Sequence, residues 1–271
     1  MSSEDNSKTD ITSVMQIAIG ASYHAGLEIL KVYNTSFAVE QKEDNSPLTL
    51  ADKSAHKVIA AALENTEYPV LSEEGRSIPY NERKAWDRFW MVDPLDGTKE
   101  FVKRNGEFTV NIALIEKGIS IAGVIYVPVT GVMYFGIVGL GAYKIESFNP
   151  DGNLDSWMKA GKKLPLNQGK TKFTVVGSRS HKSPETAEVM DKLAKEHGEL
   201  NIVSMGSSLK ICLVADGSAD IYPRYAPTME WDTAAGHAIV KAAGKEIFDY
   251  TTGKPMVYNK ENLLNNWFTV K

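Results

Sequence analysis

The segment WMVDPLDGTKEF, residues 90–101, runs an apolar, strand-like sequence into two aspartates separated by a proline and a leucine. The proline fixes one backbone angle, and Gly97 allows another group to approach the backbone closely. Gly97 could also open a helix over Thr98–Lys103, whose first N–H groups would form an anion site. Asp93 and Asp96, placed in a tight turn beside such a site, indicate a metal ion and a phosphate at the end of a buried strand.

Two further segments place carboxylates where an apolar element meets a turn. They are VLSEEG at residues 70–75, which contains Glu73, and WDTAAG at residues 231–236, which contains Asp232. Taken alone, the glutamate pair is more simply a surface charge, and Asp232 is more simply a helix N-cap. Gathered in one place, however, these carboxylates would repel one another and lose hydration, which favours protonation. A divalent cation removes that cost, and Mg²⁺ or Mn²⁺ prefers oxygen ligands.

Other phosphate and metal motifs do not fit the spacing. A haloacid-dehalogenase-type phosphatase would contain Asp-x-Asp-Gly-Thr with a single intervening residue, whereas both Pro94 and Leu95 separate the aspartates here. An EF-hand loop needs alternating oxygen ligands and a distant glutamate within about twelve residues. The sequence also contains no Gly-x-x-x-x-Gly-Lys phosphate loop and no Gly-x-Ser-x-Gly nucleophile elbow.

The composition is typical of a globular enzyme or binding protein. The chain has 271 residues, 43% of them hydrophobic and 24% charged. Its formal charge of -4 argues against general nucleic-acid binding, because a basic excess is needed to neutralise many phosphates. The single cysteine, Cys212, cannot form an internal disulfide, and no apolar run approaches the ~20 residues that span a bilayer. We therefore expect a cytoplasmic protein with no transmembrane segment and no obligatory protein partner. Peripheral attachment to the inner face of a membrane is compatible with the same composition.

The rhythm of the elements predicts three parts: a disordered tail at residues 1–9, helices on an antiparallel sheet at residues 10–165, and an α/β half at residues 166–271. Helical periodicity predicts helices over residues 11–33 and 49–64, the second with a capping box and Asp52 in its first turn. Short β-prone segments between residues 108 and 145 predict hairpins. We expect the two large parts to pack tightly, with a cleft between them.

The motifs SEEG, DPLDGT and WDTAAG occur in this order, accompanied by the longer stretches DPLDGTKEFVKRNGEFTVNIALI, GSRSH, GSSLK and YPRYAPTMEWDTAAGHA. The motifs resemble the lithium-sensitive, magnesium-dependent phosphatase superfamily that includes inositol monophosphatase. The longer stretches are most similar to its CysQ branch, the 3'(2'),5'-bisphosphate nucleotidases. The resemblance covers nearly the whole chain beyond the tail and implies a layered αβαβα sandwich, of the α+β or α/β class. It also implies hydrolysis of 3'-phosphoadenosine 5'-phosphate to AMP and phosphate, with the 5'-phosphosulfate analogue as a second substrate.

The resemblance further implies roles for individual residues. The ligands of two or three Mg²⁺ ions would be Glu73, Asp93, Asp96, Asp232 and the backbone carbonyl of Leu95. The catalytic group would comprise Glu73 and the water-activating pair Asp52 and Thr98. The phosphate-binding turn would be Gly97 and Thr98, and the nucleotide would be contacted by Ser178, His181, Ser207 and Lys210. Leu95, Asp96 and Asp232 would also meet the substrate.

Two other functions would use the same residues. A relative acting on inositol phosphates or other sugar phosphates would keep the metal site, and a non-catalytic nucleotide or metal sensor would keep the scaffold. A sensor would require loss of the water-activating pair, yet Asp52 and Thr98 are both present. The segments GSSLK and GSRSH favour the nucleotide, and Arg224 is a further candidate cation for its 5'-phosphate.

Overall fold

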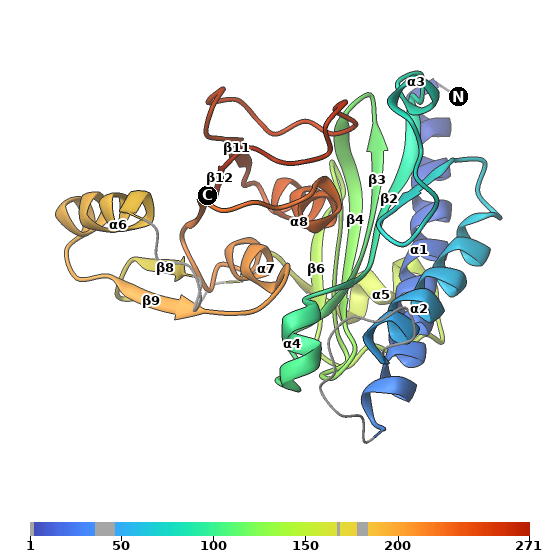
Figure 1. The fold of residues 1–271 in the computed structure, drawn as a ribbon, viewed down its shortest axis with the longest axis horizontal. Coiled ribbons are helices and arrows are strands. Elements are labelled where there is room, and N and C mark those ends of the chain that lie inside the picture. The colour runs from blue at the N-terminus through green and yellow to red at the C-terminus, as the bar shows by residue number, and fades with distance from the viewer. Residues whose placement is uncertain (1–2, 36–46, 167–168, 178–183) are drawn as a thin grey trace.

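A long β-sheet organises the chain in the computed structural model, which describes residues 3–35, 47–166, 169–177 and 184–271 (Figure 1). Within these residues, seven strands form this sheet in chain order. They are β1 (Val70–Ser72), β2 (Arg88–Asp96), β3 (Thr109–Glu116), β4 (Ile119–Val127), β5 (Val132–Ile137), β6 (Gly141–Ile145) and β7 (Lys162–Lys163). Strands β1 and β2 are parallel, and the other neighbours are antiparallel. The hairpins expected between residues 108 and 145 are confirmed as β3 to β6.

Alternation along each strand gives the sheet two different faces. On β2, Trp90 belongs to one apolar core and Met91 to the other. Helices α1 (Ser3–Tyr33) and α2 (Pro47–Leu63) cover the first face, and α8 (Glu230–Ala242) covers the second. We name these the α1/α2 face and the α8 face.

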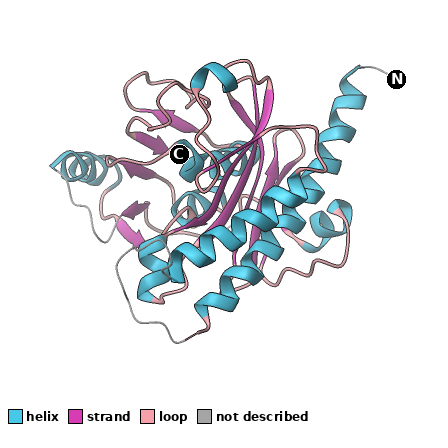
Figure 2. Cartoon of the chain, turned by 45° about the vertical axis from the view of Figure 1, so that its right-hand side comes forward, coloured by secondary structure: helices cyan, strands magenta, loops and turns pink. Residues whose placement is uncertain are grey.

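The two N-terminal helices lie side by side across their face of the sheet (Figure 2). Helix α1 begins at Ser3 rather than at Ile11, so its backbone continues through most of the segment expected to be a disordered tail. Apolar periodicity could not predict a helix here, because residues 3–10 contain no apolar residue. Helix α2 begins at Pro47, and proline is favoured in a first turn, where its missing N–H would be unpaired anyway. The prediction of a capping box with Asp52 in the first turn is therefore wrong, and Asp52 lies in the second turn.

Helix α8 packs closely on its face because the strands beneath it carry glycine. Gly123 on β4 and Gly136 on β5 are paired across the sheet. A Cβ atom on Gly123 would lie 2.5 Å from the carbonyl oxygen of Ala235, and one on Gly136 would lie 3.0 Å from the Cα of Ile239. A larger residue at either position would push α8 outward, so the glycine pair sets the distance between the helix and the sheet.

The other elements of the second half complete the layers. They are β8 (Thr174–Gly177), α6 (Pro184–His197), β9 (Asn201–Ser204), α7 (Leu209–Ala215), β10 (Tyr222–Arg224), β11 (Ile247–Asp249) and β12 (Phe268–Val270). Strands β8 and β9 are parallel, and β12 lies between β10 and β11 in an antiparallel group. In Figure 1 the order from right to left is α1 and α2, the long sheet, α7 and α8, the short strands, and α6 at the far end. This is the expected αβαβα sandwich.

Three short helices connect the strands: α3 (Tyr80–Arg83), α4 (Thr98–Lys103) and α5 (Leu154–Ala160). Helix α4 has the bounds predicted from the sequence, whereas α3 and α5 were not predicted. Across the described ranges, every helix is too short or too polar to cross a membrane.

Candidate active site

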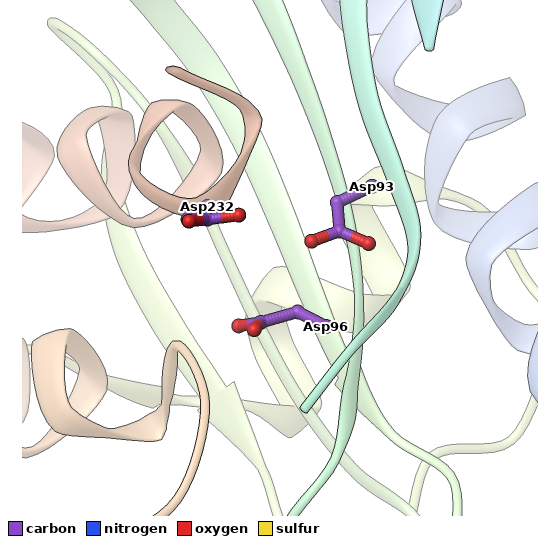
Figure 3. Close-up of side chains that lie close together, drawn as sticks. All are labelled: Asp93, Asp96 and Asp232. Atoms are coloured by element: carbon purple, nitrogen blue, oxygen red, sulfur yellow. The ribbon is translucent and has the colours of Figure 1, made fainter. Parts of the chain in front are cut away.

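Three aspartates from distant parts of the chain meet at the end of β2. Carboxylate oxygens of Asp93, Asp96 and Asp232 lie within 4.8 Å of one another. Figure 3 shows the three side chains gathered in the space between the end of β2 and the first turn of α8. Asp93 is only 1% exposed, and the other two are partly buried. The structure thus brings together residues from the DPLDGT and WDTAAG motifs.

A β-bulge explains how Asp93 and Asp96 reach the same face. Residues three apart on a regular strand point to opposite faces. Asp93 pairs with Asn111 and Asp96 with Thr109, so the step from 93 to 96 on β2 matches the shorter step from 111 to 109 on β3. The extra residue restores the phase and turns both carboxylates to the α8 face. The aspartates therefore lie in the bulged end of β2 rather than in the predicted tight turn, which begins only at Gly97.

Asp232 is the third residue of α8 and supports the start of that helix. Its Oδ2 accepts a hydrogen bond from the backbone N–H of Met229 at 2.8 Å. Met229 occupies the N-cap position, so the alternative of Asp232 as N-cap is wrong. A carboxylate at the third helical position reaches back to the same N–H in a capping box. The helix start therefore fixes where the carboxylate lies.

Burial and mutual repulsion oppose ionisation of this cluster. Burial raises the pKa of Asp93 well above its usual range, and four neighbouring carboxylates add to the effect: Asp96, Glu73, Asp232 and Asp52. Burial, followed by the charge of Asp96, raises the pKa of Asp232 to about 7. Carboxylates held together in this way are unfavourable when charged unless a cation joins them. Hard oxygen donors of this kind fit Mg²⁺ or Mn²⁺.

Glu73 and Asp52 approach the cluster from other elements, although the group within 4.8 Å found among the described residues does not include them. Glu73 directly follows β1, and its N–H donates to the carbonyl of Val92 at 3.1 Å. Because β1 and β2 are parallel, both end at the same edge of the sheet, which brings SEEG beside DPLD. Asp52 comes from α2 and is 6% exposed. Their roles as metal ligand and water activator stay predictions.

The turn after β2 is packed against the second half of the chain. Gly97 has a φ of 99°, in the left-handed region that favours glycine. A Cβ atom there would lie 3.0 Å from the Cβ of Ser207. Thr98 begins α4, and the N–H of Leu95 donates to Oδ1 of Asp93 at 3.1 Å. The Leu95 carbonyl as metal ligand, the phosphate-binding turn and the pairing of Thr98 with Asp52 stay predictions.

Two cationic side chains line a cavity of about 90 Å³ together with two of the aspartates. The lining includes Asp96, Asp232, Ser207, Lys210 and Arg224. Burial lowers the pKa of Lys210 below its usual value, and the negative charge of Asp96 offsets only part of that effect. The Nε of Arg224 is buried, and within the described residues it has no hydrogen-bond partner. Cations beside a metal-type cluster suit a phosphorylated ligand that meets both. Ser178 and His181, which were expected here, lie outside the described residues.

Ser208 is a site residue that the sequence did not single out. Its backbone N–H donates to Oδ2 of Asp96 at 2.6 Å, and its hydroxyl donates to the same oxygen. The family resemblance assigns roles to Ser207 and Lys210 of GSSLK. Spacing alone does not tell which of two adjacent serines faces the carboxylates, and the packing of this segment on β2 decides it.

Comparison with known sequences agrees with this geometry. The sequence model of the inositol monophosphatase family matches residues 10–268. The 3'(2'),5'-bisphosphate nucleotidase CysQ of Salmonella typhimurium is 45% identical over 252 residues, which make up 91% of this chain and 95% of that protein. The protein of the same name from Escherichia coli K12 is 46% identical over the same shares of the two chains, 91% and 95%.

Comparison with solved structures leads to the same group. The crystal structure of CysQ from Bacteroides thetaiotaomicron, a bacterial member of the inositol monophosphatase family, superposes with a TM-score of 0.91 at 50% identity. The match covers 96% of this chain and 97% of that one. Inositol monophosphatase II of Staphylococcus aureus, at 23% identity and a TM-score of 0.70, covers 96% of this chain and 91% of its own and shares the fold. The chain belongs to the inositol monophosphatase family.

Proposed function

We propose that the chain is a Mg²⁺-dependent phosphatase that hydrolyses 3'-phosphoadenosine 5'-phosphate to AMP and phosphate. The grouping of Asp93, Asp96 and Asp232 carries this proposal, because three clustered carboxylates call for a cation. The substrate is supported by the CysQ relatives, which carry the name 3'(2'),5'-bisphosphate nucleotidase at 45% and 46% identity. The 5'-phosphosulfate analogue is the second candidate substrate. With either substrate the enzyme would serve sulfur metabolism, and we place it in the cytoplasm.

The acidic residues would hold two or three Mg²⁺ ions at the end of β2. The proposed ligands are Glu73, Asp93, Asp96, Asp232 and the carbonyl of Leu95. When bound, such ions neutralise phosphoryl oxygens, lower the pKa of a water molecule and stabilise a leaving oxygen. This help is needed because a phosphate monoester is a dianion, whose charge opposes attack by hydroxide. Lithium is expected to inhibit by replacing one weakly held Mg²⁺.

The protein's own groups would position the reactants. Thr98, paired with Asp52, orients the attacking water and helps to remove its proton. The N–H groups of Gly97 and Thr98 contact the phosphate. The water oxygen bonds to phosphorus as the bond from phosphorus to the 3'-oxygen breaks, and the 3'-oxygen takes up a proton from solvent to leave as the 3'-hydroxyl of AMP. Transfer therefore goes directly to water without a phosphoenzyme.

The second half of the chain would select the nucleotide. Lys210, Arg224 and Ser207 line the cavity beside the carboxylates, which supports contacts with the 5'-phosphate and ribose. Ser178 and His181 are proposed for the same region. A substrate with a second phosphate gains from these cations, whereas inositol monophosphate offers them no second anionic group.

A substrate comparison tests the proposal against its main alternative, an inositol or sugar phosphatase with the same metal site. Phosphate release should be fast from 3'-phosphoadenosine 5'-phosphate and slow from inositol monophosphate. It should also disappear with a chelator and fall with lithium. Equal or faster release from inositol monophosphate would support the sugar phosphatase instead, and activity in chelator would overturn the metal mechanism.

A non-catalytic nucleotide or metal sensor is the other alternative. Isothermal titration calorimetry would reveal it as tight nucleotide binding in the presence of Mg²⁺ without release of phosphate. The presence of both Asp52 and Thr98 supports the enzyme.

A further inference from the structure

Ser208 occupies a central place between the two aspartate-bearing elements. It is 3% exposed and directly precedes α7. Its N–H and hydroxyl both donate to Oδ2 of Asp96, and its hydroxyl oxygen lies 3.0 Å from the backbone carbonyl of Asp232. The side-chain amide of Asn111 donates to that hydroxyl at 2.7 Å. One serine therefore touches β2, β3 and α8 at the carboxylate cluster.

The hydrogen bonds leave the hydroxyl little orientational freedom. A serine hydroxyl has a single proton to donate. Because Asn111 donates to the oxygen, the proton goes to one of two acceptors, and the shorter contact assigns it to Oδ2 of Asp96 rather than to the Asp232 carbonyl at 3.0 Å. The backbone N–H of Ser208 donates to Asp96 in addition, at 2.6 Å, so Oδ2 of Asp96 is held by two donors of the same residue.

We propose that Ser208 is a positioning residue that fixes the carboxylate of Asp96 for cation binding through Oδ1. The idea rests on the proposed metal role of Asp96. Two donors on Oδ2 lock the plane of the carboxylate and commit that oxygen, so Oδ1 remains for a cation shared with Asp93 and Asp232. Partners that orient a ligand in this way commonly change metal affinity 10–100-fold, as an order of magnitude.

The neighbouring serine makes a different contact. The hydroxyl of Ser207 lies 3.3 Å from Oγ1 of Thr109, and its backbone has a φ of 42°. Both serines line the cavity with Lys210 and Arg224. In GSSLK, therefore, both serines border the proposed nucleotide site, and the second also donates to the proposed metal ligand Asp96.

The test is Ser208→Ala, which removes the hydroxyl and keeps the backbone N–H. Ser120→Ala is the matched control, because the Ser120 hydroxyl is also buried and donates to the α8 carbonyl of Ala234 at 2.7 Å without touching a carboxylate. Mn²⁺ alone is titrated into wild type and both variants by calorimetry, and phosphate release is followed as a function of Mg²⁺. We expect Ser208→Ala to weaken Mn²⁺ binding about tenfold and to raise the half-saturating Mg²⁺ concentration similarly. Ser120→Ala should match wild type in both, although it also loses a buried hydrogen bond.

Wild-type Mn²⁺ affinity in folded Ser208→Ala would overturn the proposal, and so would an equal loss in Ser120→Ala, because that would indicate a general packing effect. If Ser208→Ala does not fold, Asn111→Ala removes the donor that orients the hydroxyl, together with a 3.4 Å contact from the Asn111 amide to Oδ2 of Asp96, and should weaken Mn²⁺ binding by a smaller factor. Wild-type affinity in that variant would likewise overturn it. Failure of the proposed function is separate, because it would appear in the wild-type protein as absent Mn²⁺ binding or absent hydrolysis.

Discussion

The two faces of the long sheet differ in how closely their helices approach the strands. On the α1/α2 face, Trp90 of β2, Phe108 and Phe135 of β5 contribute large side chains to the core. Phe108 directly precedes β3. On the α8 face, strand residues such as Phe89 and Tyr134 also enter the core, but at Gly123 and Gly136 the helix backbone rests almost directly on the strands. The close approach of α8 brings the short carboxylate side chain of Asp232 to the end of β2.

This difference assigns different tasks to the two faces. A core of large side chains can absorb small changes of volume, because neighbouring rotamers adjust. A helix held by backbone contacts has no such margin, so any displacement of α8 moves Asp232. We therefore expect substitutions that displace α8 to alter turnover, and changes in the core on the α1/α2 face to alter stability alone.

The largest effect is expected for Asp96→Asn, at the edge of the α8 face. The substitution keeps the shape of the side chain and removes the charge that the proposed cations need. Losing several kcal/mol of transition-state stabilisation would lower the rate of phosphate release on the order of 1000-fold. Circular dichroism should show an intact fold. A near-normal rate would contradict the metal role of Asp96.

The next largest effect is expected from two adjacent residues of β4 that point to opposite faces of the sheet. Gly123→Ala adds a Cβ that would lie 2.5 Å from the carbonyl oxygen of Ala235, so α8 must shift. We expect a loss of roughly 1–3 kcal/mol in unfolding free energy and a fall in turnover on the order of tenfold. Val124→Ala, the adjacent residue on the α1/α2 face, should cost a similar roughly 1–3 kcal/mol through its cavity and leave turnover unchanged. Urea unfolding and phosphate release, measured on both variants, test this prediction. Equal turnover in the two variants would contradict the expected difference between the faces.

The smallest effect concerns the protein without metal. The pKa of Asp232 is raised to about 7 in the folded chain, compared with about 3.9 when unfolded. The folded form therefore holds this proton more tightly, so the group's contribution to stability is greatest at low pH and is lost as the pH rises through about 7. With a chelator at pH 8, Asp232→Asn should be more stable than wild type by on the order of 2 kcal/mol.

The stability advantage of Asp232→Asn should shrink towards pH 5. Addition of Mg²⁺ at pH 8 should make wild type more stable than Asp232→Asn. Urea unfolding at both pH values measures the difference. The loss in Val124→Ala should not depend on pH. A pH-independent difference between wild type and Asp232→Asn would indicate that the charge of Asp232 is not the cause.

Periodicity and motif order predicted most of the fold and the position of the site. Helix α4 and the hairpins β3 to β6 follow directly from local signals, and the motif DPLDGT was correctly expected to meet WDTAAG. The start of α2 at Pro47 was missed, because the capping pattern at Thr49 is weaker than the preference of proline for a first turn. Helices α3 and α5 are too short to show a clear period.

Other features of the site depend on tertiary contacts and have no local sequence signal. The bulge between Asp93 and Asp96 becomes evident only when the strand is paired with β3. The contacts of Ser208 arise because its segment crosses the end of β2, which no spacing within GSSLK encodes. The sequence therefore predicts which residue types are gathered, whereas their orientation is decided by the partners around them.

The bulge in β2 has a consequence for insertions and deletions. Removing one residue between Asp93 and Asp96 would leave the two aspartates two apart, a spacing that points both to the same face of a regular strand without a bulge. Adding one residue while the single bulge is kept would turn the second aspartate towards the core under α1 and α2. The length of DPLD and the bulge are therefore coupled, because a change in one must be matched by a change in the other for both carboxylates to face α8.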